Sequence, residues 1–226
     1  MKKFGVFTVS AISTFCFLFG FSPLKVHATT VSMDFVGVGG ENSGGVYTYP
    51  YYFKINGGPE VPLMCVSYLQ EIQVPETWQA TITTIGTATP SLTVTDEEED
   101  AYLDSVVLNS GSSAQTVSDA QWAAWEVGDS GLIGHLPGGL NDAAITAEYD
   151  AAVSFVSTHT LANDPNFYDG FELYVPVPGS QSPVWDGLPQ TFIGPAPTPE
   201  PNSLFLLGSG LLAAAGALYR RNRQTA

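Results

Sequence analysis

Short apolar runs, separated by Gly-rich and Pro-rich stretches, fill the chain from about residue 31 to residue 85. They are rich in Val, Ile, Tyr and Phe, and the last of them alternates apolar and polar positions, which is typical of β-strands. The four runs cover residues 31–36, 46–55, 62–69 and 77–85. Asn56-Gly57-Gly58 follows the second run and predicts a hairpin turn, because Asn and Gly accept positive φ angles. The pattern predicts a β-rich N-terminal half.

The apolar spacing becomes helical after residue 95. Thr95 with Glu98, and Ser118 with Gln121, have the spacing of capping boxes, in which side chains bind the free N–H groups of a first helical turn. They predict the starts of two helices, and Ala and Phe residues at helical spacing predict a third over residues 140–157. We therefore expect about three short helices in this part of the chain.

The region after the helices predicts one more strand and then a linker. Residues 170–177 read as a strand, and Pro and Gly accumulate from residue 176 onward. The Pro-rich segment 195–199 predicts an extended stalk. We predict the α+β class, with a single domain over residues 29–195, which is long enough to bury a core.

The N-terminus has the parts of a secretory signal peptide. Lys2 and Lys3 precede an apolar stretch over residues 4–21, and Val26-His27-Ala28 supplies the small residues that precede a cleavage site. We predict a signal peptide over residues 1–28, so that the α+β domain is exported.

An apolar run of 17 residues, 203–219, carries no charge. At about 1.5 Å per residue a helix of this length spans roughly 26 Å, the short end of what crosses a bilayer. Arg220, Arg221 and Arg223 follow the run, and the positive-inside rule assigns that end to the cytoplasm. We predict a transmembrane helix with a cytoplasmic basic tail, which anchors the exported domain at the inner membrane. A buried helix of a globular core is the alternative.

Pro199-Glu200-Pro201 stands just before this run. A Pro-Glu-Pro motif, a membrane-length apolar segment and a terminal Arg cluster resemble the PEP-CTERM sorting signal, here over residues 196–226. The resemblance implies that a membrane transpeptidase-like enzyme, an exosortase, processes the protein, after which the domain resides at the cell surface or outside the cell. It also implies a connection with biofilm, which makes an exopolysaccharide a candidate partner.

Acidic residues dominate the predicted domain. Lys54 is the only Lys or Arg between residues 29 and 201, and all 22 Asp and Glu residues of the chain lie in that span. Phosphate binding needs cationic side chains, so nucleic acid and anionic membrane surfaces are excluded as partners of the domain. Self-repulsion that keeps exported domains apart explains most of this charge.

Signatures of enzymes and metal sites are missing from the sequence. It has no HExxH, GxSxG or Gly-rich phosphate loop, and neither His135 nor His159 has neighbours in the sequence that suggest metal binding. We expect no catalytic residue, no metal and no cofactor. Acid pairs are plentiful but cannot be positioned from the sequence, which leaves an exported polysaccharide hydrolase as an alternative.

One pair of residues stands out within the domain. Cys65 lies in an apolar strand and is the only cysteine of the domain, while Gln121 begins the segment Gln121-Trp122-Ala123-Ala124-Trp125. A Cys followed later by Gln-x-Ala-x-Trp resembles the bacterial surface thioester domains. The resemblance implies that the Cys65 sulfur attacks the Gln121 carboxamide, ammonia leaves, and the resulting thioester acylates a surface amine of a target.

An aromatic wall of Tyr68, Trp122 and Trp125 would shield such a bond from water. The structural alternative makes Cys65 a small buried hydrophobic residue and Gln121 a member of the capping box that Ser118 begins. We expect a non-enzymatic surface protein that acts in adhesion or matrix organisation. A covalent adhesin and the polysaccharide hydrolase are the alternatives.

Overall fold

The computed structural model describes residues 29–40, 42–184, 188–196 and 208–212. The predicted signal peptide, the Pro-Glu-Pro motif and the basic tail lie outside the described residues. Of the predicted membrane segment 203–219, residues 208–212 are described, and they are helical. In the described part of the chain, none of the helices has the length and apolar character that crossing a bilayer requires.

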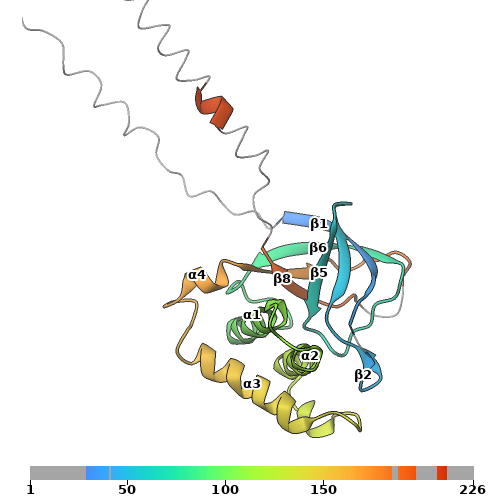
Figure 1. Cartoon of the computed structure of the whole chain (residues 1–226). Coiled ribbons are helices and arrows are strands. Elements are labelled where there is room, and N and C mark those ends of the chain that lie inside the picture. The colour runs from blue at the N-terminus through green and yellow to red at the C-terminus, as the bar shows by residue number, and fades with distance from the viewer. Residues whose placement is uncertain (1–28, 41, 185–187, 197–207, 213–226) are drawn as a thin grey trace, which may run out of the picture.

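Six strands form a closed barrel in the order β1-β4-β5-β8-β7-β6, and every neighbouring pair is antiparallel (Figure 1). The barrel strands are β1 (Thr29–Val38), β4 (Tyr51–Ile55), β5 (Glu60–Cys65), β6 (Glu76–Thr84), β7 (Phe171–Pro176) and β8 (Phe192–Pro195). Strands β2 (Asn42–Ser43) and β3 (Val46–Tyr47) form a separate two-stranded sheet. The predicted β-rich N-terminal half is confirmed, whereas the closure into a barrel was not predicted.

Strand β8 closes the barrel, and the sequence pattern missed it. It pairs with β5 through Met64↔Ile193 and Cys65↔Phe192, and it pairs with β7 on its other side. The strand has four residues and ends at Pro195, within the stretch where Pro and Gly indicated a linker. A strand this short has no alternation of its own, so the strands on either side of it determine its conformation.

The Asn56-Gly57-Gly58 hairpin is confirmed between β4 and β5. Asn56 and Gly57 have φ angles of 52° and 69°, the left-handed pair of a tight turn in which the Gly58 N–H donates to the Ile55 main-chain oxygen at 2.9 Å. The predicted strand 46–55 is divided into β3 and β4. Pro50 lies at this break, where its ring removes the N–H group that a continuous strand would need.

Three helices of 15 residues each form layers beside the barrel (Figure 1). They are α1 (Val94–Leu108), α2 (Ala114–Gly128) and α3 (Asp142–Val156). Helix α1 packs against β8, α2 packs against β5, and α3 packs against α1 and α2. The shorter elements are α4 (Pro165–Tyr168) and a 3₁₀ turn (Ile133–His135).

The predicted starts of the first two helices were wrong. Helix α1 is capped by Thr93, whose side chain accepts from the N–H of Asp96 while the Asp96 carboxylate accepts from the N–H of Thr93. Helix α2 is capped by Ser113, so Ser118 lies in its second turn and is buried. A Ser followed three residues later by a Gln also occurs inside helices, and only the main-chain geometry distinguishes the two cases.

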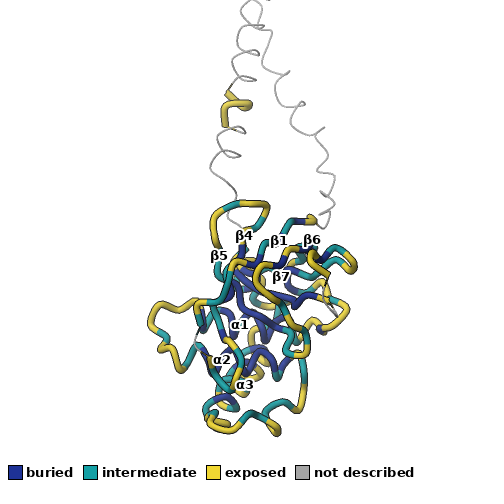
Figure 2. Tube along the Cα trace, turned by 90° about the vertical axis from the view of Figure 1, so that its right-hand side faces the viewer, coloured by how far each residue is buried: buried dark blue, intermediate teal, exposed yellow. Residues whose placement is uncertain are grey.

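Two hydrophobic clusters share the wall made by β5 and β8. Met64 and Ile193 point outward into the cluster that the helices cover, whereas Cys65 and Phe192 belong to the cluster that fills the barrel. Inside the barrel the Phe53 and Phe192 rings lie 4.6 Å apart at 62°, a favourable edge-on contact. Both clusters lie between residues 31 and 193, and Figure 2 shows this continuous buried interior. Both hydrophobic clusters of the described residues therefore lie within the predicted domain, residues 29–195.

Asp100 and Asp104 are buried carboxyl groups on α1. Both are 0 % exposed, and within the described residues none of their four oxygens has a hydrogen-bond partner. Burial raises the pKa of both groups well above the ordinary value, and the neighbouring acids Asp96 and Glu99 raise that of Asp100 further. The native state therefore holds these protons at a pH where an unfolded chain releases them.

We expect the domain to lose stability as pH rises. Each of these carboxyl groups has a higher pKa in the folded state than in the unfolded chain. Its contribution to the stability of the folded state is fully present below about pH 4, and it is lost as the pH rises through the raised pKa. Replacing Asp100 and Asp104 by Asn should raise the unfolding temperature at pH 8 by at least about 2 °C, equivalent to roughly 1 kcal/mol in a domain of this size. The measurement is the unfolding temperature of residues 29–196, with and without the two substitutions, between pH 5 and pH 8.

The exposed Asp150 provides the control, because Asp150→Asn makes the same chemical change at one carboxyl group on the surface of α3. A double variant whose unfolding temperature falls with pH as steeply as that of the Asp150→Asn protein would contradict the buried-acid explanation.

Candidate functional site

Cys65 is the last residue of β5, and its side chain points into the barrel. Leu63 and Cys65 share the inner face because side chains alternate along a strand. Cys65 pairs with Phe192 on β8, and Phe192 pairs with Tyr174 on β7, so the three side chains lie in one row inside the barrel. Cys65 is 0 % exposed.

Gln121 reaches Cys65 from the middle of α2. Its Nε2 donates to the main-chain oxygen of Cys65 at 2.5 Å, and the side chain is 0 % exposed. Its Oε1 has no hydrogen-bond partner among the described residues. Burying a carboxamide with one free acceptor is unfavourable by about 1–3 kcal/mol, while the bond from its Nε2 pairs the buried Cys65 carbonyl.

Small residues let α2 approach the end of β5 closely. Ala120, Ala123 and Ala124 are fully buried on this helix. Gly128, at the end of the helix, lies against Val66, the residue after Cys65. A Cβ at position 128 would lie only 2.7 Å from the main-chain oxygen of Val66. This close approach brings the Gln121 side chain within hydrogen-bond reach of the strand.

Tyr68, Trp122 and Trp125 pack as one aromatic group. The Tyr68 ring lies 5.6 Å from Trp122 and 5.2 Å from Trp125, and the two indoles meet at 4.9 Å and 90°. Both tryptophans belong to the cluster that contains Cys65. The structure thus brings together the five residues that the sequence singled out, and it does not support the alternative in which Gln121 belongs to a capping box.

Burial controls the chemistry of the Cys65 thiol. It raises the pKa of Cys65 to about 12, partly offset by the neighbouring Trp125 side chain. The Sγ atom lies 3.4 Å from the main-chain oxygen of Ser67, to which the thiol donates. At neutral pH the group is therefore a protonated thiol, and any attack by its sulfur requires a partner that accepts the proton.

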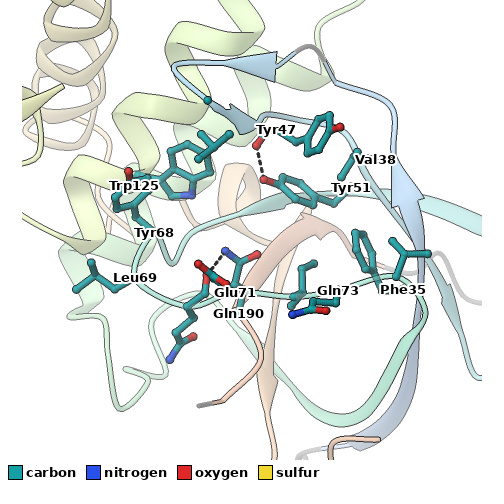
Figure 3. Close-up of a pocket in the computed structure, with 15 residues that line it drawn as sticks. Phe35, Val38, Tyr47, Tyr51, Tyr68, Leu69, Glu71, Gln73, Trp125 and Gln190 are labelled. Carbon is teal, nitrogen blue, oxygen red and sulfur yellow. Dashed lines mark hydrogen bonds between the residues drawn. The ribbon is translucent and has the colours of Figure 1, made fainter. Parts of the chain in front are cut away.

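An open pocket of about 690 Å³ lies on the solvent side of this aromatic group (Figure 3). Tyr51, Tyr68 and Trp125 line it, and Tyr51 also interacts electrostatically with Cys65. The rest of the lining comes from Phe35 and Val38 of β1, the β3 region, the segment 69–74 and Gln190. Sequence patterns could not reveal the pocket, because its walls come from five segments that no local pattern connects.

The described residues offer no metal centre: they contain no group of three or more His, Cys, Asp and Glu side chains that could hold an ion. His135 follows α2 in the 3₁₀ turn, and the His159 ring stacks on Phe155 at 4.3 Å. Pro199, Glu200, Pro201 and the arginines 220, 221 and 223 lie outside the described residues.

Residues 197–223 match the PEP-CTERM protein-sorting motif. The motif implies export, a C-terminal membrane anchor, and processing by an exosortase that leaves a protein of the cell surface or extracellular space. The search of curated proteins found no match, and the search of solved structures found none either. The sorting motif therefore identifies the route of the protein, and the function of its domain has to be inferred from the site around Cys65.

We expect the Cys65 thiol to resist alkylation in the folded domain. The Gln121→Ala variant has no carboxamide with which the sulfur could react, so it isolates the effect of burial. A rise of the pKa from 9.0 to about 12 lowers the thiolate fraction by roughly a thousandfold. Iodoacetamide should therefore modify the folded variant at least about 100-fold more slowly than the same variant in guanidinium chloride, as followed by mass spectrometry.

Adding Trp125→Ala to this variant should accelerate the modification, because it removes a side chain that packs beside the sulfur. Equal alkylation rates in the folded and unfolded protein would contradict the burial of Cys65.

Proposed function

We propose that the exported domain attaches covalently to amine-bearing surfaces through an internal thioester between Cys65 and Gln121. The observation that carries the proposal is the buried contact between the Gln121 carboxamide and the end of β5 at Cys65. The sorting motif implies an exported surface protein, and on such a protein the domain would act in adhesion or in organisation of the extracellular matrix. Covalent attachment suits a protein that must resist removal from a surface.

Formation of the bond needs no cofactor. The Cys65 sulfur attacks the Gln121 side-chain carbonyl carbon, the thiol proton passes to the departing nitrogen, and one ammonia leaves as the S–C bond forms. The unpaired Gln121 Oε1 would carry the negative charge of the tetrahedral intermediate. The buried Asp100 carboxyl group, which interacts electrostatically with Cys65, would relay the proton.

The second step consumes the thioester. An amine of the target attacks the same carbonyl carbon, an amide bond to the Gln121 side chain forms, and the Cys65 thiol is regenerated with the proton that the amine loses. Exclusion of water favours this aminolysis over hydrolysis. Full burial of both residues and the packing of Tyr68, Trp122 and Trp125 support that exclusion.

A non-covalent binding module is the second candidate function, and the pocket beside the aromatic group favours it. A concave site with apolar walls and a few polar groups is a common form of ligand site. The two functions are compatible, because the pocket would bind the same target that the thioester then acylates.

Intact mass spectrometry of residues 29–196 tests the thioester. The purified protein should weigh one ammonia less than its sequence, because formation of the bond expels that molecule. Methylamine should then raise the mass to one methylene above the sequence value, with the addition at Gln121 and a free thiol at Cys65.

The Cys65→Ala and Gln121→Ala variants serve as controls and should have their full sequence masses before and after methylamine. A wild-type protein of full sequence mass, carrying a free thiol and unchanged by methylamine, would rule out the thioester and leave the binding module.

Removal of residues 197–226 tests the role of the sorting motif separately. The truncated protein should be released in soluble form after export, whereas the full chain fractionates with the inner membrane or the cell surface. The folded domain should be unaffected, with the unfolding temperature of residues 29–196, because both hydrophobic clusters lie N-terminal to the deletion. Retention of the truncated protein in the inner membrane would refute the anchoring role.

A further inference from the structure

Two carboxamides of the pocket lining, those of Gln70 and Gln190, each carry an oxygen without a hydrogen-bond partner among the described residues. The Gln190 Nε2 donates to the main-chain oxygens of Ser67 at 3.0 Å and Gln70 at 2.5 Å, which fixes the orientation of this carboxamide. Its Oε1, on a residue only 7 % exposed, then has no hydrogen-bond partner among the described residues, and neither has Gln70 Oε1. The Tyr51 hydroxyl already donates to the main-chain oxygen of Tyr47. The Trp125 Nε1 donor has no hydrogen-bond partner in the described part of the chain either, so the unpaired atoms of the lining include two acceptors and a donor.

Aromatic rings surround these acceptors. Tyr68 and Trp125 lie on one side of the pocket in Figure 3, Tyr47 and Tyr51 lie on another, and Glu71 and Gln190 lie below them. The face of an aromatic ring carries negative electrostatic potential and attracts a cation within about 6 Å of the ring centre.

The charge of the pocket is also negative. Among the described residues that line it, Glu71 is the one charged side chain, and no Lys, Arg or His is present. An anionic ligand would meet no cationic side chain among the described residues of the lining. A positively charged ligand is therefore complementary to the rings and to the Glu71 carboxylate.

We propose that this pocket binds the ammonium group of a lysine side chain presented by a partner protein. The four methylenes of lysine match the apolar part of the wall, formed by residues such as Phe35, Val38 and Ile72. An amino sugar carries hydroxyl groups where lysine carries methylenes, so it would bury less apolar surface against these residues.

The position of the pocket connects it to the candidate thioester. Tyr51 and Trp125 line the pocket, and both also neighbour Cys65 within the barrel cluster. A lysine bound here would lie at the outer side of the aromatic group that covers Cys65 and Gln121. The role of lysine binding as a step before acylation rests on the proposed function, although the binding itself needs no thioester.

An NMR titration of residues 29–196 carrying Cys65→Ala tests the pocket without covalent chemistry. Nα-acetyl-lysine methylamide should bind at least about tenfold more tightly than the norleucine analogue, which keeps the stem and lacks the ammonium group. The indole N–H signal of Trp125 should shift, whereas that of Trp78, buried inside the barrel, should not. The affinity should fall with added salt.

Two variants locate the site. Glu71→Gln should weaken lysine binding by about threefold and Tyr47→Ala by a similar factor, because each removes one exposed contribution to cation binding. Asp150→Asn on α3 removes the same charge as Glu71→Gln far from the lining, and it should leave the affinity unchanged.

Equal affinity for the lysine and norleucine derivatives would overturn the proposal, as would tighter binding of glucosamine or of the neutral sugar cellobiose. Absence of binding by the lysine derivative would overturn it as well. These outcomes are independent of the mass measurement: a thioester without lysine binding refutes the pocket alone, and lysine binding without a thioester refutes the covalent function alone.

Discussion

A buried hydrogen bond from the Gln121 carboxamide to the main chain of Cys65 ties helix α2 to the barrel. Both residues are fully buried, so water cannot replace the bond, and its loss would leave polar groups without partners in the core. Apolar packing between a helix and a strand permits several nearly equivalent arrangements. A buried directional bond selects one of them, and the alanines of α2 allow the close approach that this arrangement needs.

The aromatic group and the pocket follow from this arrangement. Trp125 is four residues after Gln121, so the two side chains share one face of α2 and point to the same end of the barrel. Fixing Gln121 against β5 therefore brings Trp125 beside the Cys65 sulfur and against Tyr68. The same indole then forms part of the pocket wall. One contact thus positions the reactive pair, its cover and the adjacent binding surface.

Local patterns predicted the elements and the candidate pair, but they could not predict long-range pairing. Alternation and the Asn56-Gly57 turn predicted the N-terminal strands, and the Gln-x-Ala-x-Trp segment selected Gln121, which the structure brings against Cys65. Strand β8 was missed because its conformation depends on β5 and β7. Asp100 lies two residues after Glu98 of the predicted capping box, and its burial follows from the packing of α1 against its neighbours and not from its sequence neighbours.

Under the proposed mechanism, the acidic composition of the domain serves more than solubility. A protein that stores an acyl donor must keep its own lysines and those of identical copies away from it. The domain has one lysine, Lys54 on β4, and its ammonium group lies 3.8 Å from the Glu60 carboxylate across the β4–β5 hairpin. Like charge keeps copies of the domain apart, while the same negative field attracts the cationic side chains of a foreign surface. One feature of composition thus disfavours self-reaction and favours reaction with a partner.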